Sequence, residues 1–577
     1  MAFGRTARGS EHVGGVSDDG AVVPAVPSRD PSDTPAVRKA RGAFFTPDDV
    51  TRFIAAWAIT SEDDAVMEPS AGDAAFLVAA VHRLQALSTD RSRTPVIDGV
   101  EIHDYSARVG RQRVEDAGGR ARINISDFFL VEPTPAYDAV IGNPPYVRYQ
   151  DWTGDSRTRS RAAALRAGVA LSGLASSWAA FTVHSAAFLK DGGRLGLVLP
   201  AELLAVNYAA PVREFLFKHF QSVELVLFDE QVFPEAEADV VLLLASGYRA
   251  GPTDHAVIRL AKNTAALSTL GTGQPWAPRE PADKWTGSLV APRATEPLHR
   301  LRDEGSFVDL ETWGDTTLGI VTGANHFFTL SPAAVKRLGL RRSELLRLSP
   351  PGSSHLRGLD LTSSKLTRLG QAGKATYLFY PGDEPSPFAQ AYIEAGEKTA
   401  VDQAYKCRVR KPWYRVPVVK PADLLLTCMN ADTPRLTTNR AGVHHLNSVH
   451  GVYLASPHRD LGAELLPLAS LNSLTLLNAE MVGRAYGGGV LKLEPKEADV
   501  WAMPAPALVE ARASELRGIR SAVARKLQAG KLLDAVAMVD KVLLVDAGHV
   551  SGEQMSHVRD ARAELARRRM ARSASGR

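Results

Sequence analysis

The residues best suited to chemistry follow the apolar run 139–142 and read Asn143-Pro144-Pro145-Tyr146. The run predicts a buried parallel strand, and the prolines end it because proline lacks a backbone N–H and has a fixed φ. The chain therefore leaves the sheet as a stiff loop, at the carboxyl edge where open α/β sheets bind ligands. The side-chain oxygen of Asn143 and the carbonyl of Pro144 can accept both N–H groups of an exocyclic amine, while Tyr146 can stack on its ring. The alternative is a proline-rich turn with a packed tyrosine.

This loop resembles the catalytic motif of S-adenosylmethionine-dependent N6-adenine DNA methyltransferases, and the order of motifs along the chain resembles their γ class, the TaqI-like group. The resemblance runs from about Arg41 to about Pro504 and is stronger over the first half. It implies S-adenosylmethionine as the cofactor and methyl transfer to N6 of a flipped-out adenine in double-stranded DNA. The catalytic residues that it implies are Asn143, Pro144, Pro145, Tyr146 and Phe233.

Phe233 belongs to a Phe-Pro turn before the apolar strand expected at 238–245. The resemblance implies that its ring stacks on the face of the target base opposite to Tyr146. The alternative for Phe233 is a core phenylalanine near the edge of the sheet.

Three acidic residues are predicted at the ends of three successive strands ahead of the loop: Glu68, Glu101 and Asp127. Each alone could be a surface residue, but three in this order argue for a ligand-binding edge. A turn of small residues, 70–74, follows Glu68, and in it Ala74 stands where the family usually has a second glycine. An acid after such a turn typically binds ribose hydroxyls, which we expect of Glu101. Asp127 is expected to accept a hydrogen bond from the adenine amine of the cofactor.

The segment before these strands adds a further contact with the cofactor. Thr46 is a plausible N-cap, and Pro47 the first residue, of a helix that continues through Trp57. The resemblance implies that this Phe-Thr-Pro segment touches the methionine part of the cofactor, and the alternative is a well-capped amphipathic helix. The predicted cofactor-binding residues are Thr46, Glu68, Ser70, Ala71, Gly72, Glu101, Ile102, Asp127, Phe128, Asn143 and Pro145.

The alternation of apolar strands and helical segments predicts an α/β fold. We expect a doubly wound, Rossmann-like methyltransferase domain, a mixed α/β target-recognition domain and a helical C-terminal extension. The segment 147–172 is polar and rich in arginine, which fits a mobile loop near DNA phosphates and an ordinary solvated loop equally well. The expected boundaries are a disordered tail at 1–38, the catalytic domain at 39–250, a linker at 251–288, the recognition domain at 289–505, and the extension at 506–577, ending in a frayed basic tail around Arg567, Arg568 and Arg569.

The stretch 405–415 interleaves cationic and aromatic residues, which suits phosphate contact and base stacking. The alternative is a solvated strand with a buried Trp413. Two further stretches, 317–325 and 485–493, carry glycine-containing turns and resemble the target-recognition half of this group. The predicted DNA-binding residues are Lys406, Arg408, Arg410, Lys411, Trp413 and Arg415.

The composition describes an ordinary globular chain: 577 residues, 45% hydrophobic and 23% charged. The net charge of +4 permits nucleic-acid binding without requiring it. The only two cysteines, Cys407 and Cys428, exclude a disulfide framework and a cysteine-based zinc site, and neither lies in a motif for carbon-5 cytosine methylation. No metal is expected. The sequence has neither a membrane-length apolar run nor a secretory signal, so no membrane partner is expected. The resemblance implies a cytoplasmic, nucleoid-associated bacterial protein.

The sequence thus predicts a site-specific DNA adenine methyltransferase that serves as the modification enzyme of a restriction–modification system. We expect a monomer, with a separately encoded restriction endonuclease as a candidate partner. The same motif also occurs in enzymes that methylate RNA amines or protein glutamine amides, but these are usually compact and lack a second half such as 290–504. An N4-cytosine enzyme would more often have serine at Asn143. A non-catalytic DNA-binding specificity subunit would not need the cofactor acids.

Overall fold

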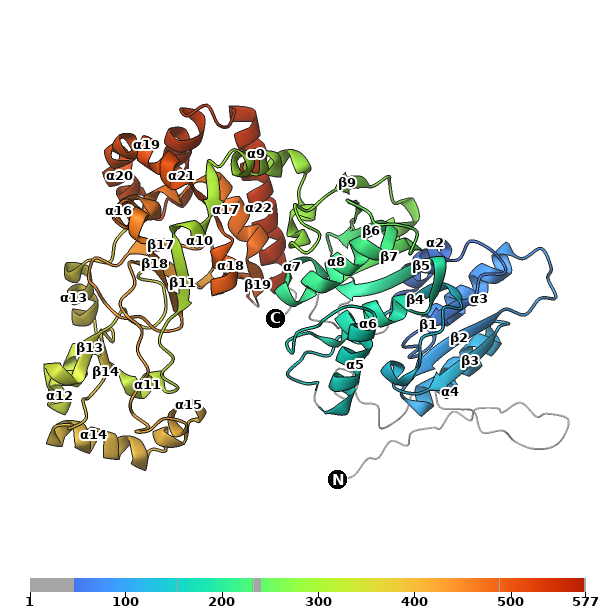
Figure 1. Cartoon of the computed structure of the whole chain (residues 1–577), viewed down its shortest axis with the longest axis horizontal. Coiled ribbons are helices and arrows are strands. Elements are labelled where there is room, and N and C mark those ends of the chain that lie inside the picture. Colours follow the sequence, from blue (N-terminus) through green and yellow to red (C-terminus); the bar gives the residue numbers. More distant parts are fainter. Residues whose placement is uncertain (1–45, 153, 231, 233–239, 487, 575–577) are drawn as a thin grey trace, which may run out of the picture. The chain divides into compact units, whose positions relative to one another are not determined.

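Figure 1 shows the computed structural model, which describes residues 46–152, 154–230, 232, 240–486 and 488–574. The predicted tail at 1–38 and Phe233 lie outside the described residues. The chain divides into two compact units, Met1–Val198 and Leu199–Arg577. This division is coarser than the domain boundaries expected from the sequence, which stay predictions.

The described part of the first unit is built on parallel strands in the order β3-β2-β1-β4-β5. The order runs outward from β1 to β3 and then returns to β4 beside β1, so the winding reverses between β1 and β4. This confirms the predicted doubly wound α/β fold. The strands are β1 Val66–Glu68, β2 Val96–Glu101, β3 Arg120–Ile125, β4 Tyr137–Gly142 and β5 Leu189–Pro200. The helices are α2 Asp48–Ala58, α3 Ala75–Leu87, α4 Asp104–Asp116, α5 Asp155–Arg166 and α6 Ser177–Ala186, with a 3₁₀ turn at Phe128–Leu130.

Strand β4 is apolar because both of its faces are covered, as is usual in parallel sheets. Val140 and Ile141 are completely buried. On the neighbouring β5, a Cβ at Gly196 would come within 2.6 Å of a methyl group of Ile54 on α2. Glycine therefore lets α2 lie directly against this strand, which brings the start of the helix to the sheet.

Two sequence expectations for the first unit are wrong. Helix α2 begins at Asp48 with Pro47 as its N-cap, and Thr46 does not cap it. The segment 147–172 is not a loop throughout, because it contains α5. Arginine and alanine favour helices strongly even where no large apolar side chain marks the period. The buried face of α5 consists only of small side chains: Ser160, Ala163 and Ala164.

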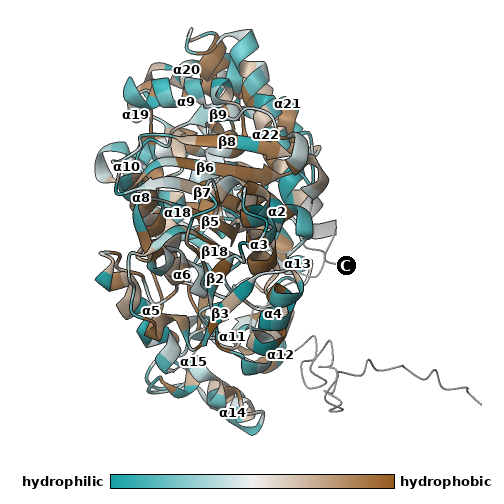
Figure 2. Ribbon diagram, turned by 90° about the vertical axis from the view of Figure 1, so that its right-hand side faces the viewer, coloured by the Kyte–Doolittle hydropathy of each residue, from teal (hydrophilic) through white to brown (hydrophobic). Residues whose placement is uncertain are grey.

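The second unit begins with strands arranged around β6 (Phe220–Phe228). Strand β7 (Val240–Tyr248) is antiparallel to β6, β8 (Ala256–Ala261) is parallel to it, and β9 (Gln274–Trp276) is antiparallel to β8. Figure 2 shows β6 in brown over much of its length, which agrees with its buried valines and leucines. Two helices precede these strands, α7 Glu202–Ala205 and α8 Ala210–His219.

The interval 251–288 differs from the expected linker. It contains β8 and β9, and the side chain of Trp285 in a 3₁₀ turn is completely buried. Strand β8 joins the sheet because its apolar positions Ala256 and Ile258 are buried where it pairs with β6. The glycines and prolines that suggested a linker separate these short elements instead.

The rest of the second unit combines small antiparallel sheets with helices, as expected for a mixed α/β region. The sheets are β10 Phe307–Asp309 with β21 Ala502–Pro504; β11 Gly314–Leu318, β18 Val449–Leu454, β15 Leu424–Thr427 and β17 Leu436–Thr438; β12 Thr329–Leu330, β14 Tyr377–Phe379 and β13 Leu345–Arg347; and β16 Met429–Asn430, β20 Val490–Lys492 and β19 Arg484–Tyr486. The helices are α9 Pro292–Asp303, α10 Leu310–Trp313, α11 Asn325–Phe328, α12 Pro332–Leu338, α13 Ser363–Gln371, α14 Pro387–Lys398, α15 Tyr405–Arg408, α16 Arg459–Ala469, α17 Ser473–Val482 and α18 Pro495–Asp499.

The predicted C-terminal extension is helical, and it is not a separate appendage. Leu516 and Leu565 belong to the same buried cluster as Trp313 and Leu474. The expected frayed basic tail is wrong, because its last two arginines lie in a helix, with side chains 11% and 4% exposed, and are paired with carboxylates. The helices are α19 Pro506–Ala511, α20 Ala513–Gln528, α21 Leu532–Asp540 and α22 Gly552–Ala574, with a π-helical turn at Lys541–Val545.

Within the described residues no single helix is both long and apolar enough to cross a membrane. The helices Ser456–Ala469 and Ser473–Val482 reach that length and composition only together, as a pair bent by 89°.

One buried carboxylate ties three of the helices together. The side chain of Asp540, at the end of α21, is 1% exposed. It accepts hydrogen bonds from the backbone N–H and the hydroxyl of Ser473 at the start of α17, both at 2.7 Å. It also pairs with Arg559 of α22 at 2.8 Å. The α17 terminus and α22 therefore depend on the same carboxylate.

We expect Asp540→Ala to lower the free energy of unfolding by about 2 kcal/mol, because it leaves buried donors of Ser473 unsatisfied. Asp534 lies on the same helix but forms an exposed ion pair with Lys526, so Asp534→Ala should change stability little. Denaturant unfolding of the full chain, followed by tryptophan fluorescence, measures both. Equal effects of the two substitutions would contradict this role of Asp540.

Candidate active site

The predicted site residues collect where the winding of the first sheet reverses. Strands β1 and β4 pair in parallel, with Met67 opposite Val140. Glu68 ends β1, and Asn143 directly follows β4. Parallel neighbours point their carboxyl ends to the same edge, and such a switch point is where doubly wound sheets bind ligands. The sequence therefore placed the acid and the amide correctly.

The amide of Asn143 is held by three neighbours. Its Nδ2 donates to the hydroxyl of Thr46 at 3.1 Å, and its Oδ1 accepts from the hydroxyl of Tyr146 at 2.7 Å. Its backbone carbonyl accepts from Ser70 Oγ at 3.3 Å. Both ends of the amide are thus held by a hydroxyl group, Thr46 at Nδ2 and Tyr146 at Oδ1. Thr46 is thus a partner of this amide and not the N-cap of α2.

The two prolines differ in what their carbonyls do. The carbonyl of Pro145 accepts a hydrogen bond from Ser177 Oγ, which itself accepts from the backbone N–H of Val147 at 2.8 Å. The carbonyl of Pro144 accepts no hydrogen bond from any described residue. A free carbonyl beside a fixed amide oxygen offers two acceptors to one incoming amine. Ser177, the first residue of α6, was not predicted as part of the site.

The hydroxyl of Tyr146 has a second acceptor, the carbonyl of Val198 at 3.0 Å. Its single proton can serve either this carbonyl or Asn143 Oδ1. Burial raises the pKa of Tyr146 well above its ordinary value of 10.0, so the side chain is a neutral donor at physiological pH. The loop therefore carries neutral polar groups and an aromatic ring, and no side chain that titrates near neutrality.

Glu68 is a buried carboxylate with an unused oxygen. The residue is 3% exposed, and its Oε2 makes no hydrogen bond with any described residue. Burial raises the pKa of Glu68 well above 4.5, and the nearby charges of Asp73 and Glu101 add to this effect. An unpartnered buried acceptor at a sheet edge calls for a ligand or a bound group.

The turn after Glu68 is open and anchored to β2. The backbone N–H of Gly72 donates to Glu101 Oε2 at 2.8 Å, and Glu101 Oε1 accepts from the N–H of His103 at 2.8 Å. Gly72 has φ +52°, and a Cβ added there would meet no atom within 4 Å. The backbone is thus accessible to a ligand. Ala74 adopts the left-handed conformation, with φ 64° and ψ 26°, that glycine would adopt more easily.

Asp127 and Phe128 follow β3 at the same edge but already have partners. Asp127 Oδ1 accepts from the N–H of Phe129 at 3.1 Å, and Oδ2 lies 3.3 Å from Ser156 Oγ and 3.5 Å from an Arg159 nitrogen. Neither residue of α5 was predicted to have this role. The ring of Phe128 is 3% exposed and stacks between two other phenylalanines. The apolar side chain that the structure exposes beside Glu101 is Ile102, which is 67% exposed.

The six predicted DNA-binding residues fall into two sets. Three are exposed, namely Lys406, Arg408 and Lys411. The other three hold the fold: Arg410 donates to the carbonyls of residues 321 and 322 at 2.6 and 2.7 Å, Arg415 pairs with the carboxylate of residue 383 at 2.7 Å, and Trp413 donates to the carboxylate of residue 397 at 2.9 Å.

Among the described residues of the second unit, Cys428, His450 and Glu494 form one group of side chains with metal-ligand chemistry. Their ligand atoms all lie within 4.8 Å of one another. However, the carboxylate of Glu494 already pairs with Lys492 at 2.6 Å, and burial raises the pKa of Cys428 to about 11. A protonated thiol beside a satisfied carboxylate fits a polar core cluster. The expectation that the chain needs no metal stays a prediction.

Comparison with known proteins agrees with the site. Residues 33–263 match the family N-6 DNA Methylase, and residues 282–544 match the C-terminal domain of the Type II methyltransferase M.Eco57I. The Type II methyltransferase M.AccI of Acinetobacter calcoaceticus is 22% identical over 470 residues, which are 80% of this chain and 84% of that protein. The Type II methyltransferase M.XamI of Xanthomonas campestris pv. amaranthicola is 26% identical over 482 residues, 80% of this chain and 85% of that protein. A solved structure of the Type IIL restriction-modification enzyme MmeI in complex with DNA has 11% identity and a TM-score of 0.49, and the match covers 90% of this chain and 75% of that one.

The site and these matches define the class of the protein: it is an adenine-specific N6 DNA methyltransferase. Its cofactor is S-adenosylmethionine, and the open turn at Gly72 and the unpartnered oxygen of Glu68 fit a polar ligand of this kind. More particularly, it is a DNA methyltransferase of a restriction–modification system. The alternatives of an RNA or protein methyltransferase and of a non-catalytic specificity subunit are not supported by these matches.

We expect Glu68→Gln to stabilise the cofactor-free protein increasingly as the pH rises above 4.5. In that range the unfolded chain loses its Glu68 proton while the folded chain, whose pKa is raised, keeps it, so the wild type loses stability as the pH rises. Glutamine has no proton to lose. The thermal midpoint of each protein, measured from pH 4 to pH 8, tests this.

The matched control is Glu115→Gln, an exposed position on α4. Glu68→Gln should also weaken binding of S-adenosylmethionine, measured by calorimetry, whereas the control should not. A difference in midpoint between Glu68→Gln and wild type that is independent of pH would contradict the raised pKa.

Proposed function

We propose that the protein is a γ-class enzyme that methylates one adenine of a specific site in double-stranded DNA after flipping the nucleotide out of the helix. In this proposal Asn143 Oδ1 and the carbonyl of Pro144 accept the two N–H groups of the adenine amine. The observation that carries it is an amide held at both ends beside a carbonyl that accepts no hydrogen bond from the described residues, both at the switch point of the sheet.

The chain's contribution to catalysis is orientation. S-adenosylmethionine supplies an activated methyl group when it is bound, so no nucleophile or metal ion from the protein is required. Two acceptors that take both N–H groups leave the nitrogen lone pair directed out of the plane of the base. Tyr146 keeps Asn143 in place through its hydroxyl and offers its ring to the base. Phe233, which lies outside the described residues, is proposed for the opposite face.

The cofactor contacts are proposed from the same edge of the sheet. Glu101 is assigned to the ribose hydroxyls, because its carboxylate already gathers the N–H groups of two turns. Asp127 is assigned to the adenine amine, which would replace its contacts with Ser156 and Arg159. Ile102 offers an apolar surface beside Glu101. The remaining contacts are proposed for Thr46, Glu68, Ser70, Ala71, Gly72, Phe128, Asn143 and Pro145.

The relatives support a role beside a restriction enzyme, and we propose that the nuclease is a separate chain. The protein is proposed to act as a monomer in the bacterial cytoplasm, in association with the nucleoid. Recognition of the target sequence is assigned to the second half of the chain, residues 289–505, with the exposed cations of the 405–415 stretch at phosphates.

Asn143→Ala should lower the rate of methyl transfer by about 10²–10³-fold, the range found when one preorganised hydrogen-bonding group is removed from a reacting centre. Tyr146→Phe keeps the ring and removes one hydrogen bond, so the rate should fall by about fivefold. Transfer of label from S-adenosylmethionine to unmethylated genomic DNA, with separation of the product nucleosides, measures both. Sequencing of the modified positions gives the site.

Asn124→Ala, an exposed position on β3, is the control for the loss of an asparagine. N6-methyladenine formed at the wild-type rate by Asn143→Ala would refute the assigned role of the amide. Label found in RNA or protein instead of DNA would refute the proposed substrate.

Substitution of the exposed cations should change the salt dependence of DNA binding, whereas substitution of Arg410, which binds backbone carbonyls, should not. Lys406→Ala, Arg408→Ala and Lys411→Ala should each weaken DNA binding and reduce the slope of log K against log salt by about 1. Arg410→Ala should instead lower the thermal midpoint, because it frees the carbonyls of Val321 and Thr322. Binding titrations at several salt concentrations measure the slopes. Unchanged slopes in all three cationic variants would remove this stretch from the DNA contact.

A further inference from the structure

The small sheet formed by β16, β20 and β19 is buried on one face at β16 and β20, while Ala485 of β19 on that face is exposed. Asn430 and Leu491 lie opposite each other on β16 and β20 and are 0% and 1% exposed. Because side chains alternate along a strand, the positions next to them point to the other side. In register, Lys492 is opposite both Met429 and Arg484, and Tyr486 is opposite the residue at position 490. We call this side the aromatic–cationic face: Met429, Arg484, Tyr486, Val490 and Lys492.

The centre of this face is an aromatic ring beside a cation. Tyr486 is 57% exposed, and Lys492 Nζ lies 5.3 Å from the centre of its ring. The tyrosine hydroxyl makes no hydrogen bond with the described residues. Strands β16, β19 and β20 contain no Asp or Glu. A ring held by a cation on a surface without strand carboxylates suits stacking on a base or a sugar next to a phosphate.

Among the described residues, the carboxylates paired with the cations of this face belong to Glu494, the N-cap of α18, and to Glu497 within α18. Glu494 pairs with Lys492 at 2.6 Å, and Glu497 pairs with Arg484 at 2.6 Å. Glu497 is buried and also pairs with Lys284 at 2.9 Å. The two cations of the face are thus each paired with a carboxylate, and the third cation, Lys284, is largely buried, with a side chain 13% exposed. The feature that suits a nucleic-acid partner is therefore the exposed ring of Tyr486 with the cation of Lys492 beside it.

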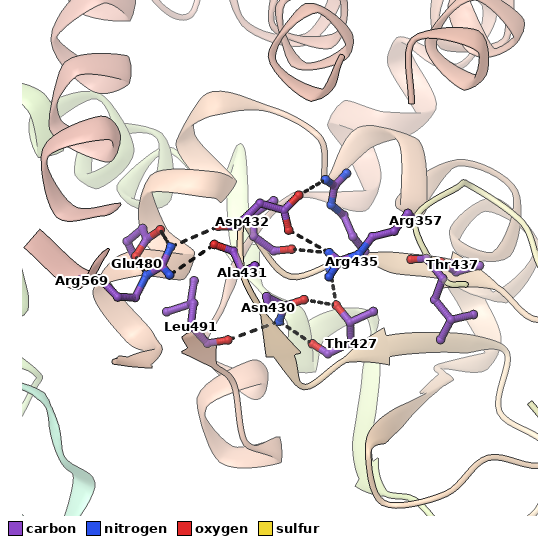
Figure 3. A network of polar contacts seen from close by, with 12 residues as sticks. Arg357, Thr427, Asn430, Ala431, Asp432, Arg435, Thr437, Glu480, Leu491 and Arg569 are labelled. Carbon is purple, nitrogen blue, oxygen red and sulfur yellow. Dashed lines mark hydrogen bonds and ion pairs between the residues drawn. The ribbon is translucent and has the colours of Figure 1, made fainter. Parts of the chain in front are cut away.

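Arg569 of α22 fixes the turns at the end of this sheet (Figure 3). Its Nε and Nη2 donate to the two oxygens of Glu480 on α17 at 3.0 and 2.9 Å. Its other contacts are to backbone carbonyls: Gly489, Ala431 at 3.4 Å and Asp432 at 3.3 Å. These five contacts match the five N–H groups of a guanidinium. The side chain is 4% exposed, so the pair with Glu480 is shielded from water.

The carbonyls that Arg569 binds belong to the ends of two strands of the sheet. The bend 431–432 follows β16, and Gly489 precedes β20. The same bend is fixed a second time, because the carboxylate of Asp432 pairs with Arg357 at 2.8 Å and with Arg435 at 2.7 Å. Figure 3 shows these contacts on either side of the bend. Arg569 of α22 therefore joins the strand ends of β16 and β20, and it shares the bend 431–432 with Arg357 and Arg435.

We propose that the aromatic–cationic face contacts duplex DNA and that Arg569 is the positioning residue of this contact. Tyr486 packs its ring against a deoxyribose, since the bases of a duplex are already stacked on one another, and Lys492 supplies charge to the neighbouring phosphate. Arg569 acts through the backbone of the sheet and does not touch DNA. The proposal rests on the proposed function, in which the second half of the chain recognises the DNA target.

The face itself is tested with Tyr486→Ala and Lys492→Gln in the full chain. Each should weaken binding to a duplex that carries the wild-type methylation site by about tenfold. Only Lys492→Gln should also reduce the slope of log K against log salt, by about 1. Leu533→Ala, which removes a 61% exposed apolar side chain on α21, is the control and should bind like wild type. Wild-type affinity of both test variants would overturn the DNA contact.

The positioning role is tested with Arg569→Met and its neighbour Arg567→Met on the same helix. Arg567 is 62% exposed in its side chain and pairs only locally, with Glu564. The double variant Arg569→Met/Glu480→Met leaves no unpaired buried charge, so it keeps the fold if the single variant does not. In Arg569→Met and in the double variant, hydrogen exchange of the amides in 484–492 should rise at least tenfold, with DNA affinity falling in parallel. Cofactor affinity should stay that of wild type.

Unchanged exchange and unchanged DNA affinity in the double variant would overturn the role of Arg569. The wild-type assay separates this outcome from a failure of the proposed function. If wild type forms no N6-methyladenine in DNA, the proposed function has failed. If wild type methylates DNA and the variants of the face and of Arg569 behave like wild type, only the present inference has failed.

Discussion

The parallel pairing of β1 with β4 is the constraint on which the active site depends. More than seventy residues separate the paired positions Met67 and Val140 along the chain, and the sheet alone brings them side by side. A slip of one residue would turn every side chain of the strand to the other face and would move Asn143 away from Glu68. The hydrogen bond from Ser70 to the backbone of Asn143 then closes the loop over the same switch point. In the proposed function, binding of the cofactor and holding of the target amine therefore both depend on this one register.

The position of much of the candidate site could be predicted because the ends of parallel strands leave a recognisable pattern in a sequence. An apolar run that stops at an acid or at a Pro-Pro step marks the edge of a parallel sheet, which is why Glu68, Glu101, Asp127 and Asn143 were placed correctly. What could not be predicted is which neighbour each side chain meets. The partner of Thr46 lies 97 residues further along the chain, and no local pattern connects them.

The second half of the chain was harder to predict for a related reason. Its strands are two to six residues long and antiparallel, so their hydrophobic periods are too short to separate from turns. The alternation of cations and aromatics around Trp413 predicts DNA contacts, but alternation does not say which cations are bound inward. Arg410 looks like its neighbours in the sequence and is held by backbone carbonyls in the structure. Similarly, the sequence around Arg569 resembles a solvated tail, whereas in the structure its guanidinium pairs with the carboxylate of Glu480 on another helix.

Ala74 shows that a nucleotide-binding turn is defined by backbone conformation before it is defined by residue type. With a φ of 64°, Ala74 occupies a position at which this family usually has glycine. The methyl group is accommodated because the turn is packed against Gly110 of α4, where a second Cβ would come within 3.1 Å. The absence of a side chain at Gly110, on the neighbouring helix, thus leaves room for the methyl group of Ala74. A pattern search that demands glycine at this position would overlook the chain, whereas one that reads the two positions as a pair would find it.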